Sequence, residues 1–283
     1  MIRLGLIGYP VSHSLSPVIQ TAALQSCGLE GDYSLFPVHP ENKQGLKDFL
    51  DRVRSGELQG LNVTIPYKQN VIEFLDELTT TAEAIGAVNT IYLQGQKLIG
   101  DNTDAPGFSS DLERLLTTEP RSHGVLKALV LGAGGSARAV AYALLNDGWE
   151  VTIAARRMEQ AQQLVQSFTT YQSLLASGNL SENLQSPVSD LSLVVNTTPV
   201  GMIPNIHRSP WPEDVPFPAG AAIYDLVYNP RETKLVRDAH LRGHLATTGL
   251  GMLIEQAILA FALWTGHKPS REIMLEAVNE TAH

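Results

Sequence analysis

Two segments of the sequence carry side chains suited to moving a proton. "NVTIPYK" places Asn62, Thr64 and Lys68 around the end of an expected strand, where Pro66 turns the backbone out of the sheet. "GDNTD" places Asp104 at the end of another strand. A lysine held beside an aspartate can move a proton on and off an alcohol oxygen. Taken alone, a lysine and an aspartate so far apart in sequence are more often separate surface charges.

A glycine-rich turn follows the strand-like run "KALVL" and opens an alanine-rich helical run. Gly132, Gly134 and Ala137 fit the pattern G-x-G-x-x-A, in which the first glycine permits a tight turn and the second lets a pyrophosphate approach the backbone. The helix N-terminus adds unpaired N–H groups and a partial positive charge. The alternative is a turn that merely packs tightly. The predicted dinucleotide site comprises Gly132, Ala133, Gly134, Gly135 and Ser136.

Two arginines occupy the position that selects between dinucleotides. An acidic residue about twenty residues after the glycine motif usually takes the ribose 2'-hydroxyl of NAD. In "VTIAARR" no acid is present, and Ala154 and Ala155 leave space. Arg156 and Arg157 provide charge-assisted donors that match a 2'-phosphate. We therefore predict NADP as the cofactor. The alternative is a solvated pair at a helix start, where the helix macrodipole disfavours cations.

Strand-like and helix-like runs alternate along the chain, which is typical of an α/β protein with a parallel sheet and crossover helices. A first series contains "RLGLIG", a helix from Ser16 with Ser16 placed as its N-cap, "YSLFPV", a helix near 42–55, "GLNVTI", a helix from about Lys68, "AVNTIYL" and "KLIGD". A second series begins at "KALVL" and includes "SLVVNTTPVGM" and "AIYDLVYNP". The restart predicts a second domain.

The last two helical runs have no strand between them, so we expect them to pack back on the first domain. The prediction is an N-terminal α/β substrate domain over residues 1–104, completed by C-terminal helices 249–283. Residues 105–248 are expected to form a Rossmann-type, doubly wound NADP-binding domain. The active site is expected in the cleft between the two domains.

Bulk composition argues against several function classes. The 283 residues carry a formal net charge of -9, whereas nucleic-acid binding relies on clustered Lys and Arg. The single cysteine allows neither an internal disulfide nor a cysteine zinc site, and the histidines lack HExxH spacing, so no metal is expected. The N-terminal apolar run is too short for a signal or membrane span. We expect a cytoplasmic monomer or homodimer with no membrane or nucleic-acid partner.

Ordered motifs cover nearly the whole chain and resemble those of the shikimate dehydrogenase family. They are "VSHSLSP", "NVTIPYK", "AVNT", "GDNTD", "GAGGSARA", "NTTPVGM", "YDLVYNP" and "GLGMLIEQA". The resemblance implies reversible NADP-linked reduction of 3-dehydroshikimate to shikimate, in aromatic amino-acid biosynthesis, by a two-domain protein. It makes Lys68 and Asp104 the catalytic pair.

The resemblance also assigns residues that contact substrate and cofactor. Hydroxyl groups would hold the substrate carboxylate: Ser14, Ser16 and Tyr228. Neutral side chains would read the ring hydroxyls: Asn62, Thr64, Asn89 and Gln256. Residues beside the nicotinamide would be Leu226 and Gly249. Each has a structural alternative; Ser16, for example, would only cap its helix.

The chain departs from the family pattern at one place. Family members that use NADP commonly show Asn-Arg-Thr after the second strand of the cofactor domain, whereas this chain has Ala155, Arg156 and Arg157. Two polar contacts to the 2'-phosphate are therefore missing, and the second arginine would replace them.

Three other functions remain as alternatives. An NAD-preferring quinate/shikimate dehydrogenase is disfavoured by the arginine pair and by serine rather than threonine at Ser16. A non-catalytic shikimate-binding sensor is disfavoured because Lys68 and Asp104 are both present. A methylenetetrahydrofolate dehydrogenase-like protein is disfavoured because the N-terminal serines and Gln256 do not suit a pterin pocket.

Overall fold

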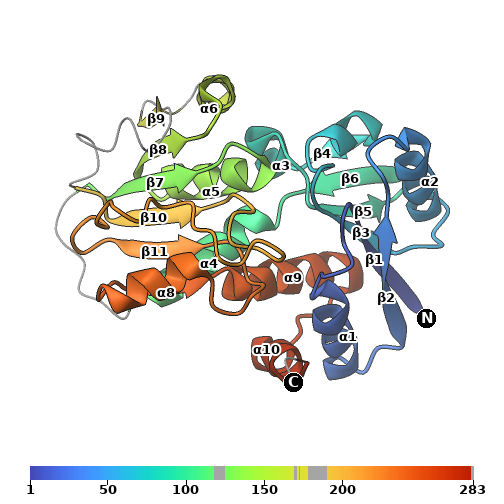
Figure 1. The fold of residues 1–283 in the computed structure, drawn as a ribbon. Helices are drawn as coiled ribbons and strands as arrows, with labels where there is room; N and C mark the ends of the chain where they lie inside the picture. Colours follow the sequence, from blue (N-terminus) through green and yellow to red (C-terminus); the bar gives the residue numbers. More distant parts are fainter. Residues whose placement is uncertain (118–124, 169–170, 172, 178–189, 282–283) are drawn as a thin grey trace. The chain divides into compact units, whose positions relative to one another are not determined.

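The chain folds as two units, each built on its own six-stranded sheet (Figure 1). The computed structural model describes residues 1–117, 125–168, 171, 173–177 and 190–281. Unit 1 comprises Met1–Gly107 and Leu253–His283, and unit 2 comprises Phe108–Met252. Unit 1 is thus assembled from two separate stretches of chain. The two points along the chain at which one unit ends and the other begins fall within helices α4 (Asp104–Leu116) and α9 (Leu250–Thr265).

The sheet of unit 1 has the strand order β2-β1-β3-β5-β6-β4. Its strands are β1 (Ile2–Gly8), β2 (Gly31–Pro37), β3 (Gly60–Val63), β4 (Glu77–Leu78), β5 (Thr90–Gln94) and β6 (Lys97–Asp101). β1 runs parallel to β2 and β3, and β4 runs parallel to β6, but β5 is antiparallel to both of its neighbours. The prediction of a parallel sheet is therefore wrong for β5. Only Gly95 and Gln96 separate β5 from β6, which permits a hairpin and leaves no room for a crossover helix.

The helices of unit 1 are α1 (Ser16–Ser26), α2 (Lys43–Arg54), α3 (Thr80–Ile85), α9 and α10 (Arg271–Glu280). The helix expected from about Lys68 is instead the 3₁₀ helix η1 (Asn70–Phe74), followed by β4 and α3. Sheet pairing explains the difference, because the N–H groups of Asp76 and Thr79 donate to carbonyls of β6. The Thr79 hydroxyl then accepts from the Ala82 N–H and starts α3 as a new helix.

The C-terminal helix α9 packs into unit 1. The Trp264 indole N–H donates to the Ile91 carbonyl on β5 at 3.0 Å. A Cβ atom on Gly60 of β3 would lie 2.1 Å from the Trp264 ring, so this strand needs a glycine beneath the indole. The Gln20 amide of α1 donates to the Ala257 carbonyl at 3.2 Å. These contacts fix α9 against both the sheet and α1.

Unit 2 has a wholly parallel sheet with the order β12-β11-β10-β7-β8-β9. Its strands are β7 (Lys127–Leu131), β8 (Glu150–Ala154), β9 (Leu174–Ser177), β10 (Leu193–Asn196), β11 (Ala222–Asp225) and β12 (Ala246–Thr248). The helices that the structure describes within this unit alone are α5 (Gly135–Asn146), α6 (Met158–Ser167) and α8 (Lys234–Leu241). Strand order reverses between β7 and β10, and in such a doubly wound sheet ligands bind outside the carboxyl ends at that point. The predicted fold class is confirmed.

Among the residues that the structure describes, no helix is long and apolar enough to cross a membrane. The same residues contain no group of three or more His, Cys, Asp and Glu side chains arranged to hold a metal ion.

Candidate active site

The structure brings the predicted catalytic pair into direct contact within unit 1. Lys68 Nζ donates to Asp104 Oδ2 at 2.5 Å, and the two side chains are 13% and 8% exposed. Asp104 is the first residue of α4, where the helix dipole favours a negative charge. Lys68 lies between β3 and η1, and its carbonyl accepts from the Val88 N–H at 2.7 Å. An ion pair this poorly hydrated is not a chance meeting of surface charges.

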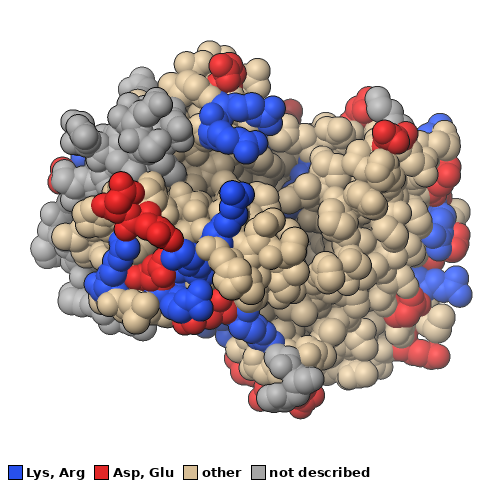
Figure 2. Space-filling view, viewed as in Figure 1, with Lys and Arg blue, Asp and Glu red and all other residues tan. Residues whose placement is uncertain are grey.

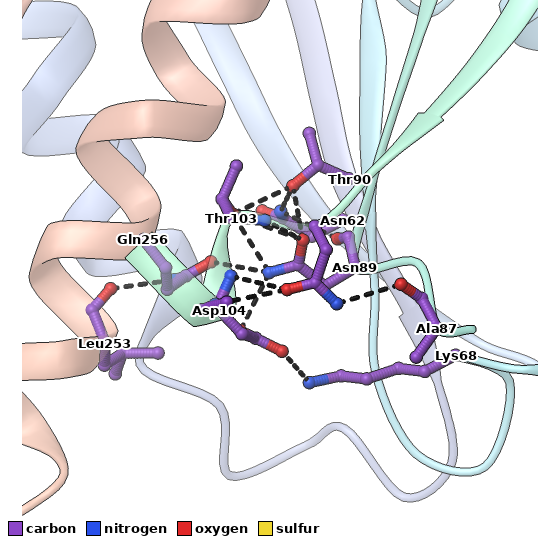
Figure 3. A network of polar contacts seen from close by, with 11 residues as sticks. Asn62, Lys68, Ala87, Asn89, Thr90, Thr103, Asp104, Leu253 and Gln256 are labelled. Carbon is purple, nitrogen blue, oxygen red and sulfur yellow. Dashed lines mark hydrogen bonds and ion pairs between the residues drawn. The ribbon is translucent and has the colours of Figure 1, made fainter. Parts of the chain in front are cut away.

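Asn89 holds the other oxygen of the Asp104 carboxylate (Figure 3). Its Nδ2 donates to Asp104 Oδ1 at 2.8 Å, and its Oδ1 accepts from the Thr103 backbone N–H, also at 2.8 Å. Because a backbone N–H can only donate, the second bond fixes which side of the Asn89 amide carries the oxygen. The Asp104 carboxylate is therefore held between a lysine on one oxygen and an amide on the other.

Asn62 contributes to the same network from β3. The Tyr33 hydroxyl donates to Asn62 Oδ1 at 2.8 Å, and Asn62 Nδ2 donates to the Asn89 carbonyl at 3.1 Å and to Thr90 Oγ1 at 3.2 Å. Both groups of the Asn62 amide are thus engaged within the protein. Thr90 in turn donates to Asn89 Oδ1 at 3.0 Å.

Sequence reasoning missed three members of this network. Thr90 and Thr103 each stand next to a predicted site residue, in "AVNT" and "GDNTD", and this adjacency was the available signal. Tyr33 lies on β2, and no motif singled it out. Its role depends on the register that sets β2 and β3 on either side of β1.

Four further predicted substrate residues lie on or beside α1, β3 and α9. The Ser14 hydroxyl donates to Ser16 Oγ at 3.1 Å. Ser16 is the first residue of α1, and the N-cap is Leu15, so the interpretation of Ser16 as the cap is wrong. Thr64 is half-buried directly after β3. Gln256, on α9, donates from Nε2 to the Leu253 carbonyl at 2.7 Å, and its Oε1 lies 3.4 Å from Asn89 Nδ2.

The glycine turn of unit 2 is shaped as a phosphate cradle. Gly132 has φ of +115°, and a Cβ there would lie 2.5 Å from Thr197 Oγ1, so both conformation and space require glycine. Gly134 is the N-cap of α5, and a Cβ there would meet no heavy atom within 4 Å. No side chain of the described chain caps this helix. The open helix N-terminus fits the phosphates of a dinucleotide.

Arg156 and Arg157 follow β8 after a single residue, Ala155, and are exposed. Within the described part of the chain, neither guanidinium has a hydrogen bond or an ion pair. Figure 2 shows Lys and Arg side chains gathered on the surface beside α6, the helix that begins after Arg157. Both arginines are therefore available to an anionic ligand.

A buried carboxylate organises the neighbouring strand ends of unit 2. Asp225, at the end of β11, is 0% exposed and accepts from Asn196 Nδ2 at 2.8 Å, from the Val227 N–H at 3.1 Å and from Thr233 Oγ1 at 2.6 Å. Burial raises the pKa of Asp225 to about 6, although the three donors oppose this. Asp225 is not among the residues predicted from the sequence, although an acid at the end of a buried strand was a signal that could have pointed to it.

The structure also brings the two predicted nicotinamide contacts together. Leu226 follows Asp225 in the chain, and its N–H donates to the Asn196 carbonyl at 2.8 Å. A Cβ on Gly249 would lie 2.4 Å from the Leu226 carbonyl oxygen, so glycine is needed there. Tyr228 is half-buried in the segment that follows β11, and thus belongs to unit 2 rather than to unit 1.

Family comparisons match three parts of the chain. Residues 6–91 match the shikimate dehydrogenase substrate binding domain. Residues 116–198 match the family described as shikimate / quinate 5-dehydrogenase. Residues 249–278 match the shikimate 5'-dehydrogenase C-terminal domain.

Individual proteins match over almost the full length. The NADP(+) shikimate dehydrogenase of Methanothermobacter thermautotrophicus is 38% identical over 275 residues, covering 97% of this chain and 94% of that protein. Shikimate 5-dehydrogenase from Thermus thermophilus, solved with NADP(H) and shikimate, is 39% identical with a TM-score of 0.85, covering 99% of both chains. Quinate dehydrogenase from Corynebacterium glutamicum, solved with NAD, is 30% identical with a TM-score of 0.86, also covering 99% of both chains.

Proposed function

The chain belongs to the shikimate dehydrogenase family, and from this premise we infer that it is an NADP-dependent oxidoreductase that interconverts 3-dehydroshikimate and shikimate. This reaction is a step of aromatic amino-acid biosynthesis. The observation that carries the inference is the buried contact between Lys68 and Asp104, with Asn89 on the second carboxylate oxygen. A shikimate-binding sensor would have no need of a buried ion pair beside neutral hydrogen-bonding groups.

We assign substrate binding to unit 1 and NADP binding to unit 2. In unit 1, the serines at the start of α1 would hold the substrate carboxylate through hydroxyl hydrogen bonds. Thr64, Asn89 and Gln256 present neutral groups suited to ring hydroxyls. A net charge of -9 agrees with this assignment, because hydroxyl and amide donors can orient an anionic polyol without a basic patch.

Lys68 and Asp104 would together handle the proton of the reacting oxygen. When shikimate is oxidised, the alcohol O–H proton passes to this pair while the C–H hydrogen leaves as hydride, and the reverse reaction returns the proton. NADP, when bound, supplies the hydride donor or acceptor. Asn89 would keep the Asp104 carboxylate oriented throughout, because it holds Oδ1 while Oδ2 faces Lys68.

NADP rather than NAD is supported by the site in unit 2. The N-terminus of α5 is open to the phosphates, and Arg156 and Arg157 are unengaged at the end of β8 within the described chain. Guanidinium groups there match a 2'-phosphate, which NAD lacks. The second arginine would replace the two polar contacts that the family's Asn and Thr make at these positions.

The test is nicotinamide absorbance during oxidation of shikimate and of quinate, each with NADP+ and with NAD+. Turnover chiefly with shikimate and NADP+ is expected. Turnover with quinate and NAD+ would instead support the quinate/shikimate alternative, and shikimate binding without any turnover would support a sensor.

The arginine assignment has its own test. Arg156→Ala and Arg157→Ala, separately and together, should lower the preference for NADP+ over NAD+ by about tenfold or more, because hydrogen bonds to charged groups contribute about 1.5–3 kcal/mol each. Arg237→Ala is the control, since it removes another exposed arginine charge, from α8 in the same unit. An unchanged preference in the double variant would refute the assignment.

A further inference from the structure

We propose that Asn102 is a positioning residue for Asp104. Its side chain has no hydrogen bond to Lys68 and instead fixes the backbone on both sides of the contact between Asn89 and Asp104. The inference rests on the proposed function, because it concerns how the catalytic carboxylate is oriented.

The Asn102 side chain is 1% exposed and bonds only to backbone. Its Oδ1 accepts from the Asp104 N–H at 3.1 Å and from the Ala105 N–H at 3.2 Å, and its Nδ2 donates to the Ala87 carbonyl at 2.9 Å. Each backbone group has a fixed role as donor or acceptor, so the orientation of the Asn102 amide is unambiguous. The oxygen satisfies the first N–H groups of α4, as a helix cap does.

The two ends of the amide connect the backbones of the catalytic residues. The Ala87 carbonyl, held by Asn102, is followed by the Val88 N–H, which donates to the Lys68 carbonyl at 2.7 Å. A continuous path therefore runs from the Lys68 backbone through Val88, Ala87 and Asn102 to the Asp104 backbone. This path sets how far apart the two main chains lie, while the side chains meet at 2.5 Å.

The same path places Asn89, two residues after Ala87, against the Asp104 carboxylate (Figure 3). Without the amide of Asn102, α4 loses its capping acceptor and the Ala87 segment loses one anchor. The Asn89 N–H still donates to the Asp101 carbonyl at 3.0 Å, so the segment stays paired with β6. Substitution should thus misplace the carboxylate without unfolding the unit.

The experiment compares Asn102→Ala, which removes all three side-chain hydrogen bonds, with Asn102→Ser, which keeps a capping oxygen and removes the amide donor to the Ala87 carbonyl. Asn42→Ala is the matched control, because Asn42 caps α2 through the Gly45 N–H at 2.9 Å and is exposed. The measurements are kcat, the KM for shikimate, the Kd values for shikimate and NADPH, and the melting temperature. Each substitution at 102 is also made in the Asp104→Asn background.

Misplacing a reacting group by about 1 Å costs up to about 100-fold in rate, so Asn102→Ala should lower kcat by roughly 10- to 100-fold. Both Kd values should stay within about threefold of the unsubstituted protein, because the substitution acts on the reacting geometry. The kcat of Asn102→Ser should lie between those of Asn102→Ala and the unsubstituted protein, and Asn42→Ala should leave kcat unchanged. In the Asp104→Asn background, the further loss from Asn102→Ala should be less than about twofold, because the effect acts through Asp104.

An undiminished kcat in both variants at 102, or an equal further loss in the Asp104→Asn background, would overturn the proposal. If Asn102→Ala does not fold, Asn102→Ser carries the same comparison. A protein that binds shikimate and NADPH but shows no turnover before any substitution would refute the proposed function, and this inference with it.

Discussion

The buried carboxylate of Asp225 should make the stability of the protein depend on pH in an unusual direction. Burial raises its pKa from 3.8 to about 6, so the folded state keeps this proton to a higher pH than the unfolded chain does. Between these pH values the folded state binds more protons, and the free energy of unfolding therefore falls as pH rises. Most carboxylates in proteins act in the opposite sense.

The size of the effect follows from the two pKa values. A pKa raised from 3.8 to about 6 corresponds to roughly 3 kcal/mol of stability lost on passing from acid to neutral pH. About 2 kcal/mol of this falls between pH 4 and pH 7, because titration is gradual at both ends.

Asp225→Asn removes the charge and keeps the geometry. The asparagine oxygen can accept from Asn196 and Val227, and its amide can donate to Thr233, whose hydroxyl already accepts from the Val236 N–H. Relative to the unsubstituted protein, the variant should gain about 2 kcal/mol in free energy of unfolding between pH 4 and pH 7. Any cost of the rearranged bonds is the same at every pH and cancels from this difference.

The assay is urea denaturation of both proteins across this pH range. Asp76→Asn is the control of opposite sign, because a side-chain hydrogen bond from Arg54 holds the pKa of Asp76 below its usual value. The ionised Asp76 contributes stability that is lost as pH falls. The free energy of unfolding of Asp76→Asn should therefore rise relative to that of the unsubstituted protein as pH falls. If the free energies of unfolding of Asp225→Asn and of the unsubstituted protein change with pH in parallel, the reasoning is refuted.

Three further substitutions test the catalytic pair, the phosphate cradle and the packing of α9. Lys68→Met should lower turnover by about 100- to 10,000-fold while shikimate binding survives, and an unchanged rate would remove Lys68 from proton transfer. Gly134→Ala should leave the melting temperature unchanged and weaken NADPH binding by about tenfold, because the added Cβ enters open space at the phosphate cradle; unaltered affinity in a binding titration would contradict that. Gly60→Ala should destabilise the protein by about 1–3 kcal/mol, because its Cβ would lie 2.1 Å from the Trp264 ring; equal denaturation midpoints would show that the indole moves freely.

Sequence reasoning worked best where a strand end carries chemistry. Lys68 and Asp104 were predicted to act together, and the structure places them in contact. The glycine turn was predicted from its position between a buried strand and a helix, and Gly132 has the positive φ that the pattern requires. For the pair, strand ends bring residues that are distant in sequence together, whereas the turn is recognised from its local strand–turn–helix context.

Other features depended on pairings that no local pattern specifies. The antiparallel course of β5 follows from a short connection whose only turn signal is Gly95. The contact of Tyr33 with Asn62 needs the exact neighbours of β1 to be known. Asp225 looks like any acid at a strand end until its burial is known. These features come from tertiary packing rather than from residue spacing.

The division of the chain also bears on how the protein forms during synthesis. Unit 2 is one uninterrupted stretch, Phe108–Met252, whereas unit 1 needs α9 and α10 from beyond it. A ribosome therefore completes everything that unit 2 requires while unit 1 still lacks the helix that carries Trp264 and Gln256. Because domains generally fold as units during translation, we expect the second unit to fold first. The sheet of unit 1 would then stay partly exposed until α9 and α10 have been synthesised.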